Sequence, residues 1–161
     1  MKNNLNLKLI PKNESEKEQF LEETIKDYAK GLAKANDLNI EEAMEMSKRQ
    51  IEQALYHQKE TTQTKIVTIF DETIDQAVGG IWFVINTEKM TAYSYQIFVD
   101  EKHRGKGYGK AALSELHNFC KTQNIKRTSL SVFGWNTLAF DLYKKMGYEI
   151  VQIVMKKDLD E

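Results

Sequence analysis

The sequence contains few residues that cross-link or interrupt a chain: Cys120 is its one cysteine and Pro11 its one proline among 161 residues. A single cysteine excludes an intrachain disulfide and a cysteine-based zinc cluster, and we interpret Cys120 as a small core residue on a helix. No apolar run reaches the roughly 18 residues of a membrane-spanning helix, and the N-terminus lacks the apolar core of a signal peptide. We therefore expect a cytoplasmic protein with no metal and no membrane partner.

The net charge is also small, at −1, but acidic and basic residues are distributed unevenly along the chain. Residues 14–45 carry ten acidic side chains against four basic ones, whereas residues 102–127 carry seven basic against one acidic. Because the basic residues gather around one loop, they favour a small polyanionic ligand and argue against nucleic acid as a partner. For the acidic block we favour a solvated helix face, with a wall that attracts a cationic substrate as the alternative.

Length and periodicity indicate one α/β domain with a mixed sheet flanked by helices. Alternating leucines over residues 5–9 predict a first strand with one buried face. Ser15 to Glu18 has the pattern of a capping box, and Asn39 with Glu42 would cap a second helix. Further strands are predicted over 65–70, 77–86, 90–99 and 128–133, helices from 111 and over 137–146, and terminal strands after them.

The most informative segment is a basic loop with a glycine at every second position, at Gly105, Gly107 and Gly109, between an apolar strand and a helix. Glycine lacks a Cβ, so such a loop can curl and direct several backbone N–H groups at one anion. The helix that follows adds the positive end of its dipole at the same point. A phosphate or pyrophosphate is therefore the expected ligand.

Two common phosphate-binding patterns fit this loop poorly. A P-loop needs four residues between its glycines and then Lys-Ser/Thr, but five residues after Gly105 stands Lys110, and Ala111 has no hydroxyl. Residues 107–112 match the glycine spacing of the dinucleotide-binding fingerprint, with alanine as its third small residue. It also needs a carboxylate at the end of the next strand, and residues 128–133 have none.

A third pattern, Arg/Gln-x-x-Gly-x-Gly/Ala, is met in full by residues 104–109, which read Arg-Gly-Lys-Gly-Tyr-Gly. Residues 136–148 add the pattern Asn-x-x-Ala-x-x-Leu-Tyr-x-x-x-Gly-Tyr, one strand downstream. Together these motifs resemble those of the GCN5-related N-acetyltransferases, the GNAT superfamily, in which the first motif binds the pyrophosphate of acetyl-CoA. The resemblance covers residues 65–159 well and the first sixty only loosely.

The resemblance implies an α/β fold with a mixed, mostly antiparallel sheet of six to seven strands, flanked by four helices, in which two strands splay apart at the cofactor. It implies one acetyltransferase domain over residues 1–161, in which residues 1–60 border the acceptor and residues 61–161 bind acetyl-CoA as co-substrate. The implied activity is transfer of the acetyl group to an amine of a small molecule or peptide. Whether the protein forms a homodimer is left open.

The same resemblance implies which residues contact the cofactor. The strand before the loop would pair with the pantetheine arm through Ile97, Phe98 and Val99, with one N–H directed at the carbonyl oxygen where negative charge develops. The pyrophosphate would lie on the loop and the start of its helix, formed by Arg104, Gly105, Lys106, Gly107, Tyr108, Gly109 and Lys110.

Asn136 and Tyr143 complete the predicted site. From residue type alone Asn136 reads as a helix cap, and the family motif adds a contact with the cofactor arm. Tyr143 could be a core aromatic; by resemblance it is a cofactor contact and the general acid that protonates the leaving thiolate. A phenol with a pKa near 10 is suited to that task. Gly147 is expected to be a C-terminal cap.

The general base and the acceptor are left open by the sequence. The strand before the loop contains no carboxylate, and we interpret His57 as solvated. Aromatic residues at these spacings are more often core, but five could line an acceptor pocket: Tyr28, Tyr56, Trp82, Tyr93 and Trp135. Two hypotheses follow, an active N-acetyltransferase and a catalytically idle CoA-binding module that regulates or binds another protein.

Overall fold

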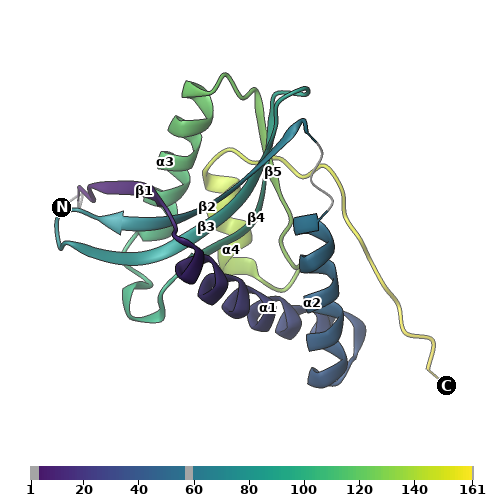
Figure 1. Cartoon of the computed structure of the whole chain (residues 1–161). Helices are drawn as coiled ribbons and strands as arrows, with labels where there is room; N and C mark the ends of the chain where they lie inside the picture. The colour runs from purple at the N-terminus through teal and green to yellow at the C-terminus, as the bar shows by residue number, and fades with distance from the viewer. Residues whose placement is uncertain (1–3, 57–59, 161) are drawn as a thin grey trace.

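The computed structural model describes residues 4–56 and 60–160, which fold into one mixed sheet with helices on both faces (Figure 1). The sheet order is β1-β2-β3-β4-β5, in which the first four strands are antiparallel neighbours and β5 lies parallel to β4. The strands are β1 (Leu7–Pro11), β2 (Thr62–Asp71), β3 (Gln76–Asn86), β4 (Thr91–Val99) and β5 (Arg127–Leu130). The helices are α1 (Glu14–Asn36), α2 (Ile40–Tyr56), α3 (Tyr108–Thr122) and α4 (Thr137–Lys145), with a short 3₁₀ helix, η1, at Glu101–His103.

Local capping explains where α1 and α2 begin. The Asn13 side chain accepts a hydrogen bond from the Glu16 backbone N–H at 2.9 Å, and the Asn13 N–H donates to the Glu16 carboxylate at 3.4 Å. The capping box therefore begins two residues before the expected Ser15, because Asn13 is an equally strong cap with a glutamate three positions on. The predicted cap of α2 is confirmed: the Glu42 N–H donates to the Asn39 side chain at 2.9 Å.

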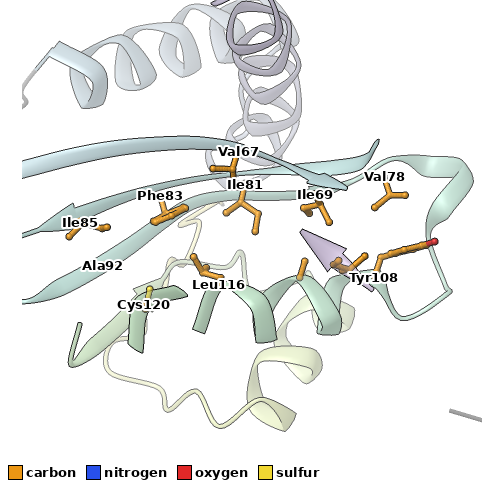
Figure 2. Packing of buried hydrophobic residues seen from close by; sticks show 12 residues of the cluster. Val67, Ile69, Val78, Ile81, Phe83, Ile85, Ala92, Tyr108, Leu116 and Cys120 are labelled. Atoms are coloured by element: carbon orange, nitrogen blue, oxygen red, sulfur yellow. The ribbon is translucent and has the colours of Figure 1, made fainter. Parts of the chain in front are cut away.

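The larger core lies between the sheet and α3 (Figure 2). Ile81 and Phe83 of β3 and Leu116 of α3 are each exposed by 1% or less. Cys120 belongs to the same cluster, as predicted, and its burial raises the pKa of its thiol. Because α3 is held by this apolar face, its N-terminus and the glycine loop before it are fixed beside the end of β4.

A second cluster lies on the opposite face of the sheet, where α1 and α2 pack. Phe20 of α1 and Ile51 of α2 contact Ile66 and Trp82, and all four side chains are buried. Figures 1 and 2 show α1 and α2 on this face and α3 and α4 on the other. The two faces therefore carry different halves of the chain, with the sheet between them. No helix within the described residues is both long and apolar enough to cross a membrane.

The predicted class of fold is confirmed, but the sheet has fewer strands than expected. The described residues form five strands, where six to seven were predicted, and none follows β5. Residues 149–160, here called the C-terminal tail, run away from the sheet as an extended segment (Figure 1). Its apolar side chains are exposed, with Val151 at 93% and both Val154 and Met155 at 87%. The composition of a strand is present, but pairing needs a partner edge, which local sequence does not specify.

Candidate active site

The sheet opens between β4 and β5. Their parallel pairing ends at Ser94 opposite Leu130, although β4 continues to Val99. On its other edge β4 stays paired with β3 to its last residue. Residues 95–99 therefore have no neighbouring strand on the β5 side in the part of the chain that the structure describes, and the predicted splay is confirmed. An extended ligand could pair with β4 here as an additional strand.

β4 carries a β-bulge at the point where the sheet opens. Trp82 of β3 pairs with Gln96 and Phe83 pairs with Ser94, so that Tyr95 has no residue opposite it. The Tyr95 ring stacks on Trp82 with centroids 4.4 Å apart. A bulge changes the direction in which the neighbouring side chains point, and bulges are frequent beside active sites.

The glycine loop follows β4 and opens α3. Gly105 and Gly107 have φ angles of 74° and 88°, in the left-handed region that favours glycine, and Gly107 is the N-cap of α3. A Cβ added at Gly105 would meet no atom within 4 Å, so the surface of the loop is open. No side chain among residues 4–56 and 60–160 caps the N-terminus of α3, so its first N–H groups can donate to a ligand. An uncapped helix N-terminus behind such a loop suits a pyrophosphate.

The basic residues of the loop fall into two groups. Arg104 is engaged with β4: its Nε donates to the Val99 carbonyl at 2.8 Å, and its guanidinium lies 5.1 Å from the centroid of the Phe98 ring. Arg104 thereby holds the loop against the strand. Lys106 and Lys110 are exposed and have no ion pair within the described part of the chain. Their charge is available to an anion bound at the loop.

The second sequence motif forms α4, which lies across the opening from β4. The Asn136 side chain accepts a hydrogen bond from the Ala139 N–H at 3.3 Å, so the cap expected from its residue type is present. At the other end Gly147 has a φ of 92°, its N–H donates to the Lys144 carbonyl, and the next N–H donates to the Tyr143 carbonyl. These bonds form a Schellman motif, as the C-terminal cap prediction required.

The surroundings of Tyr143 favour the protonated form of its phenol. The residue is partly buried on α4, and its ring centroid lies 5.7 Å from that of Tyr148. Burial, and secondarily the neighbouring Tyr148, raises the pKa of Tyr143 above its ordinary value of 10. The hydroxyl therefore carries its proton throughout the neutral range and can donate it.

A cavity of about 690 Å³ occupies the opening. It reaches from α1 and α2 across the splayed strands to α4, where Asn136 and Tyr143 line it. One wall carries Trp82, Tyr93 and Tyr95 from the sheet. Phe133 and Trp135, whose stacked rings have centroids 4.7 Å apart, also line the cavity. Cavities of this size and lining are typical of small-molecule sites.

The helices of the first sixty residues close the cavity on its remaining side. Tyr28 of α1 donates a hydrogen bond to the Gln50 side chain of α2 at 2.7 Å, and its ring lies 5.9 Å from that of Phe133. Gly31 permits this closeness, since a Cβ there would lie 2.2 Å from Cε2 of Phe133. Four of the five aromatic residues proposed for an acceptor pocket line the cavity, and the fifth, Tyr56, is 83% exposed and lies outside it.

One carboxylate in the cavity was missed by sequence reasoning. Asp27 of α1 accepts a hydrogen bond from Gln96 Nε2 at 3.0 Å, and both residues line the cavity. Of the ten acidic residues in the block over 14–45, Asp27 alone is part of this lining. The signal available in the sequence was its spacing, three residues after the buried Thr24 and one before Tyr28, although the Asp27 side chain itself is exposed. Only the packing of α1 on the sheet shows that it meets β4.

The remaining predicted residues lie elsewhere. The Tyr108 side chain points into the core, with 5% exposure, and its hydroxyl donates to Asp71 at 2.6 Å, so only its backbone is available to the loop. Figure 2 shows this ring beside the buried residues of β2 and β3. His57 lies outside the described residues.

The sheet opens along β4, the glycine loop and the N-terminus of α3 follow that strand, and the cavity lies at the opening, an arrangement that suits an extended anionic ligand. The chain belongs to the acetyltransferase (GNAT) family, whose model matches residues 30–148. The family resemblance of its two motifs is thus confirmed.

Individual relatives agree with this assignment. The chain is 31% identical to the uncharacterized N-acetyltransferase YycN of Bacillus subtilis (strain 168) over 157 residues, which cover 96% of this chain and 100% of that protein. The crystal structure of YycN superposes with a TM-score of 0.86 at 30% identity, covering 97% of this chain and 100% of the other. A shorter match of 55 residues, at 36% identity, covers 34% of this chain and 36% of the spermine/spermidine N(1)-acetyltransferase of the same organism.

Proposed function

We propose that this protein transfers the acetyl group of acetyl-CoA to an amine of a small molecule or peptide by direct attack. The observation that carries the proposal is the end of β4–β5 pairing at Ser94, which leaves one side of β4 unpaired from the cavity to Val99, before the open glycine loop. The partial match to a spermine/spermidine N(1)-acetyltransferase also supports an amine acceptor. When bound, acetyl-CoA supplies an acetyl thioester, whose C–S bond breaks as the new C–N bond forms.

The residues of the loop fit the anionic part of acetyl-CoA. Within the described residues no side chain caps the N-terminus of α3 at Gly107, and Gly105 and Gly107 have positive φ angles. Lys106 and Lys110 would add charge. The unpaired edge of β4, at Ile97, Phe98 and Val99, would pair with the extended arm, which places the thioester at the opening of the sheet.

In this proposal Tyr143 is the general acid. Its raised pKa keeps the phenol protonated at neutral pH, and it lines the cavity at the opening. Donation from its hydroxyl would protonate the departing CoA sulfur. Asn136, next to it in the lining, would contact the cofactor arm while it caps α4.

The two parts of the chain have separate roles in the proposal. Residues 61–161 would hold acetyl-CoA, while residues 1–60, with Trp82, would border the acceptor. The contribution of α1 and α2 to the cavity supports this division, because residues of both helices line it and none of residues 104–110 does.

We also propose that the assembly is a homodimer in which each C-terminal tail pairs with β5 of the second copy. β5 is an edge strand, and the tail carries an exposed apolar run of residues typical of a strand buried on both faces. Each copy offers both the edge and the tail, so a two-fold exchange satisfies both at once.

The activity is tested by measuring thiol release from acetyl-CoA across a panel of amines, polyamines, amino acids and peptides. Acceptor-dependent release is expected. Binding of acetyl-CoA without release on any amine would instead favour the idle CoA-binding module. Calorimetry tests the loop: Lys110→Ala should weaken acetyl-CoA binding about three- to tenfold at low salt and less at high salt. Lys121→Ala, at the far end of α3, is the matched control and should leave binding unchanged.

A further inference from the structure

The exposed part of the glycine loop lies between two buried rings. Residues 104–107 are all exposed, whereas His103 before them is 6% exposed and Tyr108 after them is 5% exposed. The two rings contact each other edge to face, with centroids 5.7 Å apart and an interplanar angle of 79°. The four exposed residues therefore begin and end at one buried ring contact.

Tyr108 holds the helix end of the loop in the core. Its ring belongs to the cluster between the sheet and α3, and its hydroxyl donates to Asp71 at 2.6 Å. Figure 2 shows this ring at the end of the cluster where Val78 lies. A side chain that packs on Tyr108 is thus attached to a fixed part of the molecule.

His103 holds the strand end of the loop, as the last residue of η1. The Asp100 N–H donates to the Val78 carbonyl at 2.8 Å, and the His103 N–H donates to the Asp100 carbonyl at 2.8 Å. These bonds attach the backbone of the turn to β3. The contact of the His103 ring with Tyr108 adds a side-chain attachment immediately before the exposed residues.

The ring of His103 acts here by packing and not through its Nε2 atom. That nitrogen is buried and has no hydrogen-bond partner within the described residues. A buried polar atom without a partner is unfavourable, so Nε2 does not explain why the side chain is buried. The edge-to-face contact with Tyr108 does.

The loop needs attachment at its ends because little packs against its middle. Gly105 and Gly107 have positive φ angles, and glycine loses more conformational freedom on ordering than any other residue. A Cβ at Gly105 would meet no atom within 4 Å, and one at Gly107 would meet only Leu5 Cδ1, at 4.0 Å. The bond from Arg104 Nε to the Val99 carbonyl supports one end. The buried ring contact joins both ends.

We propose that His103 is a positioning residue for the glycine loop: its ring, packed on Tyr108, keeps residues 104–107 in the conformation that receives an anion. His103 does not contact the anion itself. A loop that is already ordered loses less conformational entropy when it binds. This inference rests on the proposed binding of acetyl-CoA at the loop, and it adds a residue outside the sequence motif, which begins at Arg104.

Calorimetric titration with CoA tests this role without any acetyl transfer. His103→Ala removes the ring and should raise the Kd for CoA about 5- to 30-fold, the conformational entropy of ordering roughly one more backbone residue. In steady-state assays the KM for acetyl-CoA should rise, while kcat changes by less than about twofold. The reason for this split is that none of residues 104–107 lines the cavity where transfer is proposed.

Two further variants separate the ring from the nitrogen and from general stability. His103→Phe keeps a ring of similar size, so the Kd for CoA should stay within about twofold of the wild type. Ile85→Ala removes a buried side chain from the same cluster at the other end of β3, where Ile85 pairs with Ala92. It should lower the free energy of unfolding, measured in urea, and leave the Kd unchanged.

If His103→Ala does not fold, His103→Leu makes the same test, because leucine fills part of the space but has no ring. We then expect a rise in Kd of about two- to fivefold. Wild-type affinity in the variant without a ring would overturn the role of His103. So would an equal loss in His103→Phe, or an equal loss in Ile85→Ala.

These outcomes leave the proposed function standing, because in each of them the wild type still binds CoA. A wild-type protein that does not bind CoA would overturn the proposed function, and this inference with it. The two failures are therefore told apart by the first titration.

Discussion

Burial decides what Tyr143 can do. A phenol in water has a pKa near 10 and protonates a thiolate readily, but so would solvent. Partial burial at the opening of the sheet raises the pKa of Tyr143 and keeps the proton on its hydroxyl at neutral pH. The family motif identified Tyr143 from the sequence alone. Its burial and its place in the cavity lining depend instead on how α4 lies across from β4.

Tyr143→Phe should lower kcat by roughly 10²–10⁴, the usual contribution of general acid catalysis, because only the proton donor is lost. The Kd for acetyl-CoA should stay the same, since the ring and its packing remain. In the wild type the rate should decline only above pH 10, where a phenol of raised pKa begins to ionise, and this alkaline limb should be missing in the variant. Stopped-time assays measure kcat and its pH dependence, and calorimetry measures the Kd.

The exposed Tyr56 provides the control for this substitution. Tyr56→Phe removes the same hydroxyl outside the cavity and should leave kcat and the pH profile unchanged. Turnover of Tyr143→Phe equal to that of the wild type would show that water or another group protonates the thiolate.

Gly31 shows how an absent side chain shapes the acceptor wall. A Cβ at this position would lie 2.2 Å from Cε2 of Phe133, so Gly31→Ala must displace the ring that stacks on Trp135. We expect the free energy of unfolding to fall by about 1 kcal/mol, because overpacking costs about 1–3 kcal/mol and the better helix propensity of alanine offsets part of it. The acceptor KM should rise with the altered wall.

Chemical denaturation and steady-state kinetics measure these two effects. Gly134→Ala is the matched control, since a Cβ there would meet no atom within 4 Å. If both variants behaved alike, the close contact between α1 and Phe133 would have no energetic consequence.

At the scale of elements, one buried hydrogen bond fixes the start of α3 beneath the sheet. Tyr108 is the first residue of α3, and Asp71 is the last residue of β2. Their 2.6 Å bond lowers the pKa of Asp71, chiefly through the Tyr108 hydroxyl, and raises the pKa of Tyr108 to about 12. The glycine loop therefore enters its helix from a fixed point.

Tyr108→Phe should reduce the free energy of unfolding by about 1–3 kcal/mol at pH 7, because the buried Asp71 carboxylate loses its strongest partner. The pKa of Asp71 is lower in the folded state, so its contribution is full above the ordinary value of 3.8 and is lost as the pH falls below it. The pKa of Tyr108 is higher in the folded state, so its contribution is full below pH 10 and is lost as the pH rises from 10 toward about 12.

Urea denaturation over a range of pH values measures this difference between wild type and variant. It should be largest between about pH 5 and 9 and shrink outside that window. Tyr56→Phe, at an exposed position, should show no difference at any pH. A constant difference across the acid and alkaline limits would contradict the role given to this bond.

At the scale of the whole molecule, the tail and the free edge of β5 determine the expected assembly. Sedimentation equilibrium of the full chain should give the mass of a dimer at micromolar concentration. The double variant Val151→Lys/Ile153→Lys should give a monomer, because charged residues cannot enter a strand that is buried on both faces. Acetyl-CoA affinity should be kept in both.

Leu138→Lys controls for the loss of an exposed apolar residue outside the tail, since Leu138 is 85% exposed on α4. That variant should remain a dimer. A full chain that stays monomeric at all concentrations would indicate that the tail pairs with β5 of its own copy, and the dimer proposal would fail.

Features that depend on neighbours in the sequence were determined by the sequence itself. The glycine loop and the caps at Asn39 and Gly147 follow from conformational preferences of a few adjacent residues, and the structure contains them, although α3 begins at Tyr108, three residues before the helix predicted from 111. The two motifs also identified the family, because their residue types and spacing recur in it. The capping box was placed two residues late, at Ser15, since Asn13 and Ser15 are equally good caps and each is followed three positions on by a glutamate.

The tertiary structure decided whatever depends on contacts between distant segments. Asp27 reaches the opening of the sheet only because α1 packs over β4, which brings it to a glutamine 69 positions away in the chain. The five-stranded sheet and the exposed tail have the same origin: an apolar run has the composition of a strand, but strand pairing is satisfied only by an edge elsewhere. Local preference sets the loops and caps, while long-range packing determines where a carboxylate meets a cavity and whether a strand finds a partner.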